Sequence, residues 1–168
     1  MKTLAHCALF VLCGCMMSAA TYTVGPNRQY KELDEVPWQS LLPGDTVAIY
    51  WRAAPYKGKF VLCRVGTRTM PIVVRGIPNP SGDLPVIDGD DATTSTALNF
   101  WNEARGIIKI GGANQPPDTT PEYIRIEDLE IRSGRPGYFF TGRDGRQAQC
   151  FLLDAGQHLV VLQRVVTV

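Results

Sequence analysis

Histidine is the residue type that this chain most clearly lacks. Only two histidines occur among the 168 residues: His6 near the start and His158 directly before an apolar run. A Ser-His-Asp triad cannot be argued from one isolated histidine, and a capping or solvated role explains His158 without catalysis. A phosphate-binding glycine loop, a zinc-ligand spacing and a dinucleotide fingerprint are also missing. The sequence therefore offers no motif for the reaction classes that such signatures identify.

An excess of either charge is missing as well. Lysine and arginine together number 17, aspartate and glutamate 16, and the formal net charge is +1. A chain that binds nucleic acid usually carries a clear excess of positive charge. We therefore expect no nucleic-acid partner.

The chain has no apolar run long enough for a conventional membrane span. The apolar stretch from Leu4 to Met17 is shorter than the ~20 residues that a span needs, so no transmembrane anchor is expected. Lys2 precedes this stretch and Ser18-Ala19-Ala20 follow it, which is the pattern of a secretory signal. We expect cleavage after Ala20 and a secreted, periplasmic or cell-surface protein. The alternative is a lipoprotein signal, because Leu12-Cys13-Gly14-Cys15 resembles a lipobox that would place the lipid on Cys15.

Cysteine is scarce beyond this leader. Three of the five cysteines lie in the first twenty residues, which leaves Cys63 and Cys150. Secretion permits a disulfide, but two residues so distant in sequence would have to lie on neighbouring strands. Both stand in or beside apolar runs, so we expect buried, inert thiols. A disulfide between them remains the alternative.

What the chain does contain is a repeat. Apolar residues occupy the first, third and sixth positions of three short segments, each a strand of period two that runs into a bend. The first two copies begin 52 residues apart, and the next two 36 residues apart. The copies are Ile72–Ile77, Ile124–Leu129 and Val160–Val165. Unequal spacing between similar strands favours a solenoid whose turns vary in length.

The expected fold is therefore all-β, a right-handed parallel β-helix solenoid. Residues 1–20 form the signal, 21–45 a first strand with a short N-terminal capping helix, and 46–168 the coils. Pro37 limits any helix between Tyr30 and Leu42 to a few turns. The last copy reaches the C-terminus on an apolar strand without a cap, so we expect a truncated solenoid or self-association through that open edge.

The order of turns and strands resembles one known group. It is carried by the segments Pro43–Val47, Gly66-Thr67 with Pro71–Gly76, and Pro85–Gly89. These look like the N-terminal part of the secreted right-handed parallel β-helix proteins of the pectin-lyase-like group. The resemblance implies the fold and a polysaccharide ligand, with a substrate groove along the middle coils. Its motifs are architectural and do not imply one reaction.

The densest acidic segment is a candidate cation site. Asp88, Asp90 and Asp91 surround a single glycine, and calcium takes oxygen ligands of this kind. The spacing is wrong for an EF-hand loop. The competing interpretation is an ordinary turn at the end of the strand that contains Val86 and Ile87. Calcium is the only cofactor that the sequence suggests.

A basic and aromatic segment is the candidate glycan site. Arg132 and Arg135 could hold the carboxylates of an acidic sugar, and Tyr138 could stack on a sugar ring. In lyases of the resembled group a basic residue removes the proton beside the substrate carboxylate, but the arginine-proline motif of pectate lyases is incomplete here. The alternative is an ordinary outward loop. Glu127 and Glu130 alternate with apolar residues, so we expect them to face solvent.

Two functions follow as hypotheses. The first is a secreted β-helix protein that binds or degrades an acidic polysaccharide; if it is an enzyme, it is a lyase or a glycoside hydrolase. The second is a non-catalytic scaffold that binds a cell-surface glycan or another partner through its outer loops. The sequence does not decide whether the protein is catalytic, or which glycan it takes.

Overall fold

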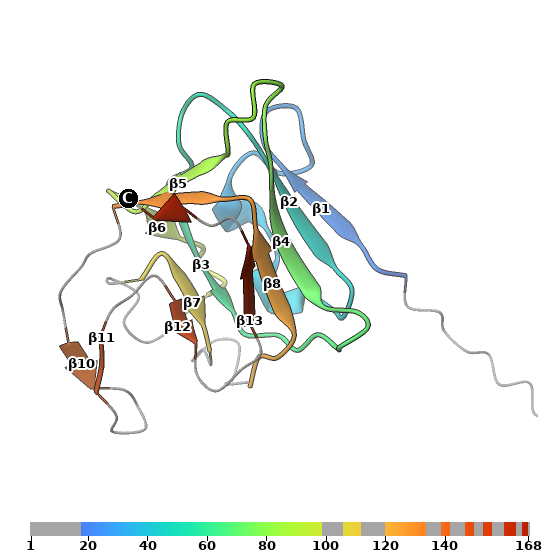
Figure 1. Ribbon diagram of the computed structural model, residues 1–168, viewed down its shortest axis with the longest axis vertical. Coiled ribbons are helices and arrows are strands. Elements are labelled where there is room, and N and C mark those ends of the chain that lie inside the picture. The colour runs from blue at the N-terminus through green and yellow to red at the C-terminus, as the bar shows by residue number, and fades with distance from the viewer. Residues whose placement is uncertain are drawn as a thin grey trace, which may run out of the picture.

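The computed structural model describes residues 18–98, 106–111 and 120–133, and the backbone of five later strands. Those strands are β10 (Phe139–Thr141), β11 (Gln147–Gln149), β12 (Leu153–Ala155), β13 (Val160–Gln163) and β14 (Val166–Thr167). The described part is mostly short strands, nearly all of them paired in parallel (Figure 1). The prediction of an all-β protein is confirmed.

Among the described residues the parallel strands form three sheets. Sheet A contains, in spatial order, β1 (Thr21–Val24), β2 (Thr46–Tyr50), β4 (Ile72–Ile77), β8 (Ile124–Glu127) and β13. Sheet B contains β5 (Val86–Asp88), β9 (Glu130–Arg132) and β14. Sheet C contains β3 (Gly58–Leu62), β6 (Thr93–Thr94), β7 (Ile108–Ile110) and β12. The strands β10 and β11 form an antiparallel pair.

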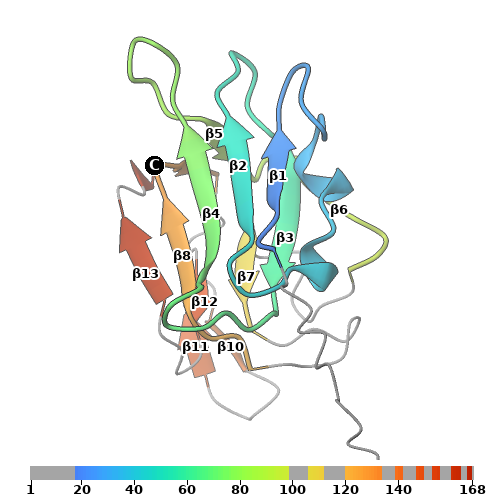
Figure 2. The ribbon, with the colours of Figure 1, turned by 90° about the vertical axis from the view of Figure 1, so that its right-hand side faces the viewer.

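From β4 onward the chain visits these sheets in a constant order. It runs from β4 in sheet A to β5 in sheet B and β7 in sheet C, and then returns to β8 in sheet A. The next circuit takes β9, β12 and β13 in the same way. Each return places a new strand of sheet A beside the previous one, so that the strands stand side by side in Figure 2.

The sequence repeat and the strand register coincide. Ile72 pairs with Ile124, and Ile124 pairs with Val160, so the first positions of the three copies form one row across sheet A. The fourth positions, Arg75, Glu127 and Gln163, form another row. A shift of one residue would exchange the buried and outward faces of a strand. The buried apolar positions of the repeat therefore specify this register.

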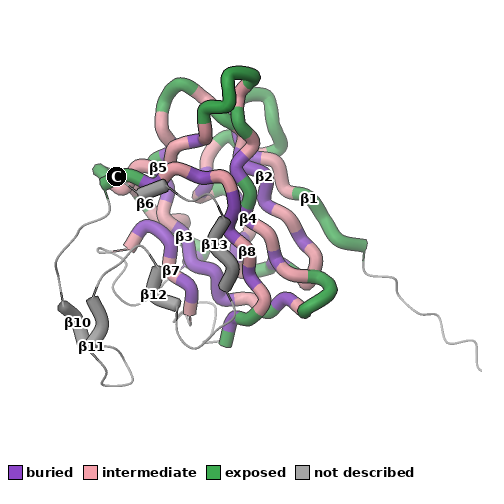
Figure 3. The backbone as a smooth tube through the Cα atoms, viewed as in Figure 1, coloured by how far each residue is buried: buried purple, intermediate pink, exposed green. Residues whose placement is uncertain are grey.

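The core lies between the three sheets. Buried and less buried residues alternate along β4, while β2 and β8 bury Ala48 and Glu127 in addition to the inward residues (Figure 3). Sheet A contributes Val47, Ile49, Ile72, Val74, Ile124 and Ile126. Ile87 and Ile131 enter from sheet B, and Phe60, Ile108 and Ile110 from sheet C. Burial of each such side chain stabilises the fold by about 1.5–3 kcal/mol before entropy is counted.

The corner between sheets A and B is tight. Asp128 has a φ of 53°, in the left-handed region, and connects β8 to β9 through the buried Leu129. On the neighbouring strand, a Cβ atom at Gly76 would lie 1.7 Å from the Asp128 carbonyl oxygen. Only glycine lets the two backbones approach this closely. The corner therefore depends on a residue without a side chain at position 76.

The short helix expected between Tyr30 and Leu42 is present as two 3₁₀ helices. Two short 3₁₀ helices, η1 (Leu33–Glu35) and η2 (Trp38–Ser40), flank Pro37 and lie beside β3 (Figure 2). Trp38 stacks on Phe60 with ring centroids 3.9 Å apart and donates its indole N–H to the Leu33 carbonyl. Proline permits only short helical pieces here. The prediction of a short helix here is confirmed, and its role as a cap stays a prediction.

The start of the described chain is fixed by a buried carboxylate. Asp45 is buried and accepts hydrogen bonds from the backbone N–H groups of Ala20, at 2.8 Å, and Leu42, at 2.9 Å. The Ala20 carbonyl in turn accepts the N–H of Thr46. Cleavage after Ala20 would remove both of these Ala20 groups from the ladder between β1 and β2. The cleavage position remains a prediction.

Cys63 is a free thiol, buried at the end of β3. Burial raises the pKa of this thiol, which lowers the fraction of reactive thiolate. This agrees with the prediction for Cys63, whereas Cys150 lies outside the described residues. In the part of the chain that the structure describes, no helix is long and apolar enough to span a membrane.

Candidate functional site

The structure brings two of the predicted sites together. Asp88 at the end of β5 pairs in register with Arg132 at the end of β9. Lys57 reaches the same place: its Nζ lies 3.0 Å from Asp88 Oδ2 and donates to the Asp90 carbonyl at 2.8 Å. The other Asp88 oxygen accepts the Asp90 backbone N–H at 3.0 Å. Residues from three separate segments therefore meet around the Asp88 carboxylate.

These contacts describe a turn closed by a lysine. The pKa of Asp88 is lowered to about 2, first by the hydrogen bond from the Asp90 backbone and then by those from Ser133 and Lys57. Asp91 has a φ of 53°, a turn conformation that aspartate tolerates. The Lys57 ammonium already contacts the Asp88 carboxylate that calcium would need. Among the described residues, no three potential metal-ligating side chains lie close enough together to hold a metal ion. The geometry therefore gives the calcium interpretation no support.

The Asp88 contacts predict a pH dependence of stability. The folded-state pKa of about 2 lies below the ordinary aspartate value of about 3.9, so the stabilisation is complete above about pH 4 and is lost as the pH falls toward 2. Urea unfolding measures the free energy of unfolding of the wild type and of Asp88→Asn. The difference between the two values should become smaller as the pH falls from about 5 to about 2.5. If the difference in unfolding free energy did not change with pH, the lowered pKa of Asp88 would be contradicted.

Arg132, the first predicted glycan ligand, has an acidic environment. Its side chain is half-exposed, and its Nε lies 2.5 Å from Glu130 Oε1 on the same strand. Asp88 pairs with Arg132 across the sheet, and its own counter-charge is Lys57. The Arg132 charge is already matched by Glu130, which disfavours an anionic ligand. Arg135 and Tyr138 lie outside the described residues.

A second charged group, which sequence reasoning missed, lies on the outer face of sheet A. Glu127 is almost fully buried: its side chain is 4% exposed. Arg75 on β4 contacts its Oε2 through Nε at 2.9 Å and Nη2 at 2.8 Å, and Arg125 Nη2 contacts its Oε1. The two arginine side chains are 47% and 40% exposed. We call Arg75, Arg125 and Glu127 the arginine–glutamate cluster.

The burial of Glu127 corrects the expectation that it faces solvent. The strand alternation does turn it outward, but Arg75 from the neighbouring circuit covers it. The signal was present in the repeat, because Arg75 and Glu127 occupy the same position of two copies. Two guanidinium groups against one carboxylate leave a charge of +1, and both arginine side chains are partly exposed. Such a cluster can bind a carboxylate or sulfate in two-pronged fashion.

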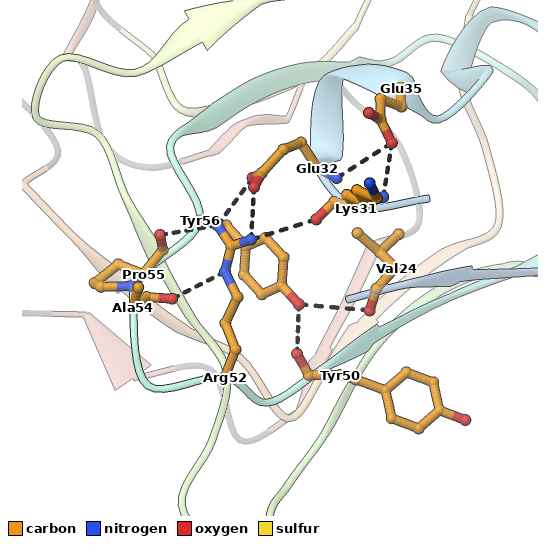
Figure 4. A network of polar contacts seen from close by, with 9 residues as sticks. All are labelled: Val24, Lys31, Glu32, Glu35, Tyr50, Arg52, Ala54, Pro55 and Tyr56. Carbon is orange, nitrogen blue, oxygen red and sulfur yellow. Dashed lines mark hydrogen bonds and ion pairs between the residues drawn. The ribbon is translucent and has the colours of Figure 1, made fainter. Parts of the chain in front are cut away.

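Arg52 shows the opposite arrangement, a saturated arginine (Figure 4). Its Nη1 and Nη2 contact the two oxygens of Glu32 at 2.6 and 2.8 Å. Its remaining N–H groups donate to the carbonyls of Lys31, Ala54 and Pro55. The guanidinium also lies 3.8 Å above the Tyr56 ring. Every donor of Arg52 is used within the fold, so its role is structural.

Arg52→Lys tests this role. An ammonium on a flexible chain cannot reproduce the forked contacts to Glu32 and the carbonyls of the following loop. We expect a loss of about 2 kcal/mol in the free energy of unfolding, since several hydrogen bonds to a charged group disappear together. Urea denaturation measures the loss. Arg68→Lys, at an exposed position before β4, is the control and should change stability by less than about 0.5 kcal/mol.

The chain was compared with protein-family models, with curated proteins and with solved structures, and none of the three comparisons found a match.

Proposed function

We propose that this chain forms a secreted right-handed parallel β-helix that binds acidic polysaccharide on the outer face of sheet A. The β-helix is supported by the constant order of the three sheets and by the register that joins equivalent repeat positions. Connections between parallel strands of one sheet are almost always right-handed. Secretion is supported by the leader pattern in residues 1–20.

The single observation that carries the binding function is the arginine–glutamate cluster. A buried carboxylate holds two half-exposed guanidinium groups on adjacent strands. Binding sites whose side chains are fixed before the ligand arrives lose less entropy on binding. The fixed guanidinium groups present donors to a uronate carboxylate or a sulfate ester, the anionic groups of acidic polysaccharides.

The same geometry favours binding over catalysis at this position. Both oxygens of Glu127 face guanidinium groups, and its side chain is buried. A general base must come within hydrogen-bond reach of the substrate proton. Glu127 therefore acts as the support of the arginines. This corresponds to the non-catalytic, glycan-binding hypothesis from the sequence, with the lyase or hydrolase as the alternative to test.

A polysaccharide panel separates these possibilities. The protein is titrated with polygalacturonate, alginate and a neutral dextran, and binding is measured by calorimetry at two salt concentrations. We expect binding to the two acidic polymers, weaker at high salt, and none to dextran. Equal binding to dextran, or no binding to either acidic polymer, would contradict the proposal.

Incubation of the same mixtures identifies catalysis. Ultraviolet absorbance from unsaturated ends would replace the binding module by a lyase, and new reducing ends without that absorbance would replace it by a hydrolase. Intact polymer after prolonged incubation is the expected result.

A further inference from the structure

The outer face of sheet A carries a third fixed arginine. Arg28, which is exposed in the loop after β1, lies with its guanidinium carbon 3.6 Å from the centroid of the Tyr50 ring. A cation held over an aromatic ring at this distance is attracted by the ring electrons. Gly25 makes room for the pair, because a Cβ there would lie 3.1 Å from Tyr50 Cβ and 3.6 Å from Arg28 Cγ. Arg28 is therefore positioned by its surroundings.

Strand geometry places this pair on the same face as the arginine–glutamate cluster. Val47 and Ile49 of β2 point into the core, so Tyr50 points outward. Figure 4 shows its ring directed away from Arg52 and Tyr56. Tyr50 pairs with Ile77, two residues along β4 from Arg75. Standard strand spacing and rise place the backbones of Tyr50 and Arg75 about 8 Å apart on that face.

The residue between the two positions is small. Ala48 on β2, two residues before Tyr50, pairs with Arg75 and is buried. The positive groups thus follow one another across β2, β4 and β8. Across these strands the surface extends roughly 10 Å, which is two strand spacings and longer than one pyranose ring.

We propose that this face binds an acidic oligosaccharide lying across the strands, with separate anionic groups at the arginine–glutamate cluster and at Arg28. The inference rests on the proposed function and adds a ligand length to it. Arg28 supplies a second subsite for a carboxylate or sulfate some sugar units away from the first. Tyr50 positions the Arg28 guanidinium and leaves its N–H groups available around the ring edge.

The test is the dependence of affinity on ligand length. Galacturonate and its dimer, trimer and tetramer are titrated into the wild type, Arg28→Gln and Arg68→Gln. In the wild type and in Arg68→Gln, affinity should rise on the order of tenfold when the ligand becomes long enough to reach both subsites. In Arg28→Gln this rise should disappear, while affinity for the shortest ligand that binds stays within about twofold of wild type.

A second variant guards against a purely structural effect. In Tyr50→Leu the increase of affinity with ligand length should also disappear, because the Tyr50 ring no longer holds Arg28. Thermal unfolding verifies that both variants fold. A full rise in Arg28→Gln, or an equal loss for every ligand length, would overturn the inference while leaving the proposed function intact. Absence of binding by the wild type at every length would overturn the proposed function itself.

Discussion

Gly76→Ala is expected to prevent stable folding. The added Cβ would lie 1.7 Å from the Asp128 carbonyl oxygen and 2.8 Å from both the Asp128 carbonyl carbon and Pro85 Cγ. The first two are backbone atoms at the corner between sheets A and B, so relief requires strands β4 and β8 to separate. We expect a loss of more than about 4 kcal/mol, at the extreme of single substitutions. Soluble yield, circular dichroism and thermal unfolding measure it.

Gly106→Ala is the matched control for this prediction. A Cβ at Gly106 meets none of the described residues within 4 Å, so the same chemical change should alter stability by less than about 1 kcal/mol. If Gly76→Ala unfolds at the wild-type temperature, the backbones at Gly76 and Asp128 do not lie as close together as described.

Removal of both arginines from the cluster should have the second largest effect. In Arg75→Gln/Arg125→Gln the Glu127 carboxylate, which is 4% exposed in the wild type, loses its counter-charges. An uncompensated buried charge typically costs about 3–5 kcal/mol. Urea unfolding at neutral pH should show this loss as a lower midpoint with an unchanged slope. Each single replacement should cost less, because one guanidinium remains.

A rescue variant distinguishes charge burial from lost packing. Adding Glu127→Gln to the double variant removes the buried charge, so at least half of the lost stability should return. If the triple variant is no more stable than the double one, the charge of Glu127 does not govern the effect. A double variant within about 1 kcal/mol of wild type would show that Glu127 is not buried as described.

Much of the fold was predictable because the repeat is a burial pattern. Ile72, Ile124 and Val160 are equivalent in sequence and pair in register, since only that register keeps all three copies facing the core. Conformation between strands was less predictable. The short helix predicted around Pro37 is 3₁₀ in geometry, and the β10–β11 pair was not predicted.

The candidate site was less predictable than the fold. Sequence reasoning selected Arg132, whose partner Glu130 lies two residues away on the same strand. It did not select Arg75 and Glu127, which are 52 residues apart. Alternation along one strand says that Glu127 points outward, but its burial is set by a side chain from another circuit. Such cross-strand pairs become visible only once the register is known.

The central claim is that the arginine–glutamate cluster binds acidic polysaccharide. It is tested most directly by measuring how tightly two single variants bind an acidic polymer. Arg75→Gln, Arg125→Gln and Arg68→Gln each remove one positive charge, and polygalacturonate binding is measured for all three at the same salt concentration. If the arginine–glutamate cluster binds the polymer, the first two variants should each lose on the order of tenfold in affinity, and Arg68→Gln should match the wild type. Equal affinities in all three variants would contradict the assignment of the binding site to the outer face of sheet A.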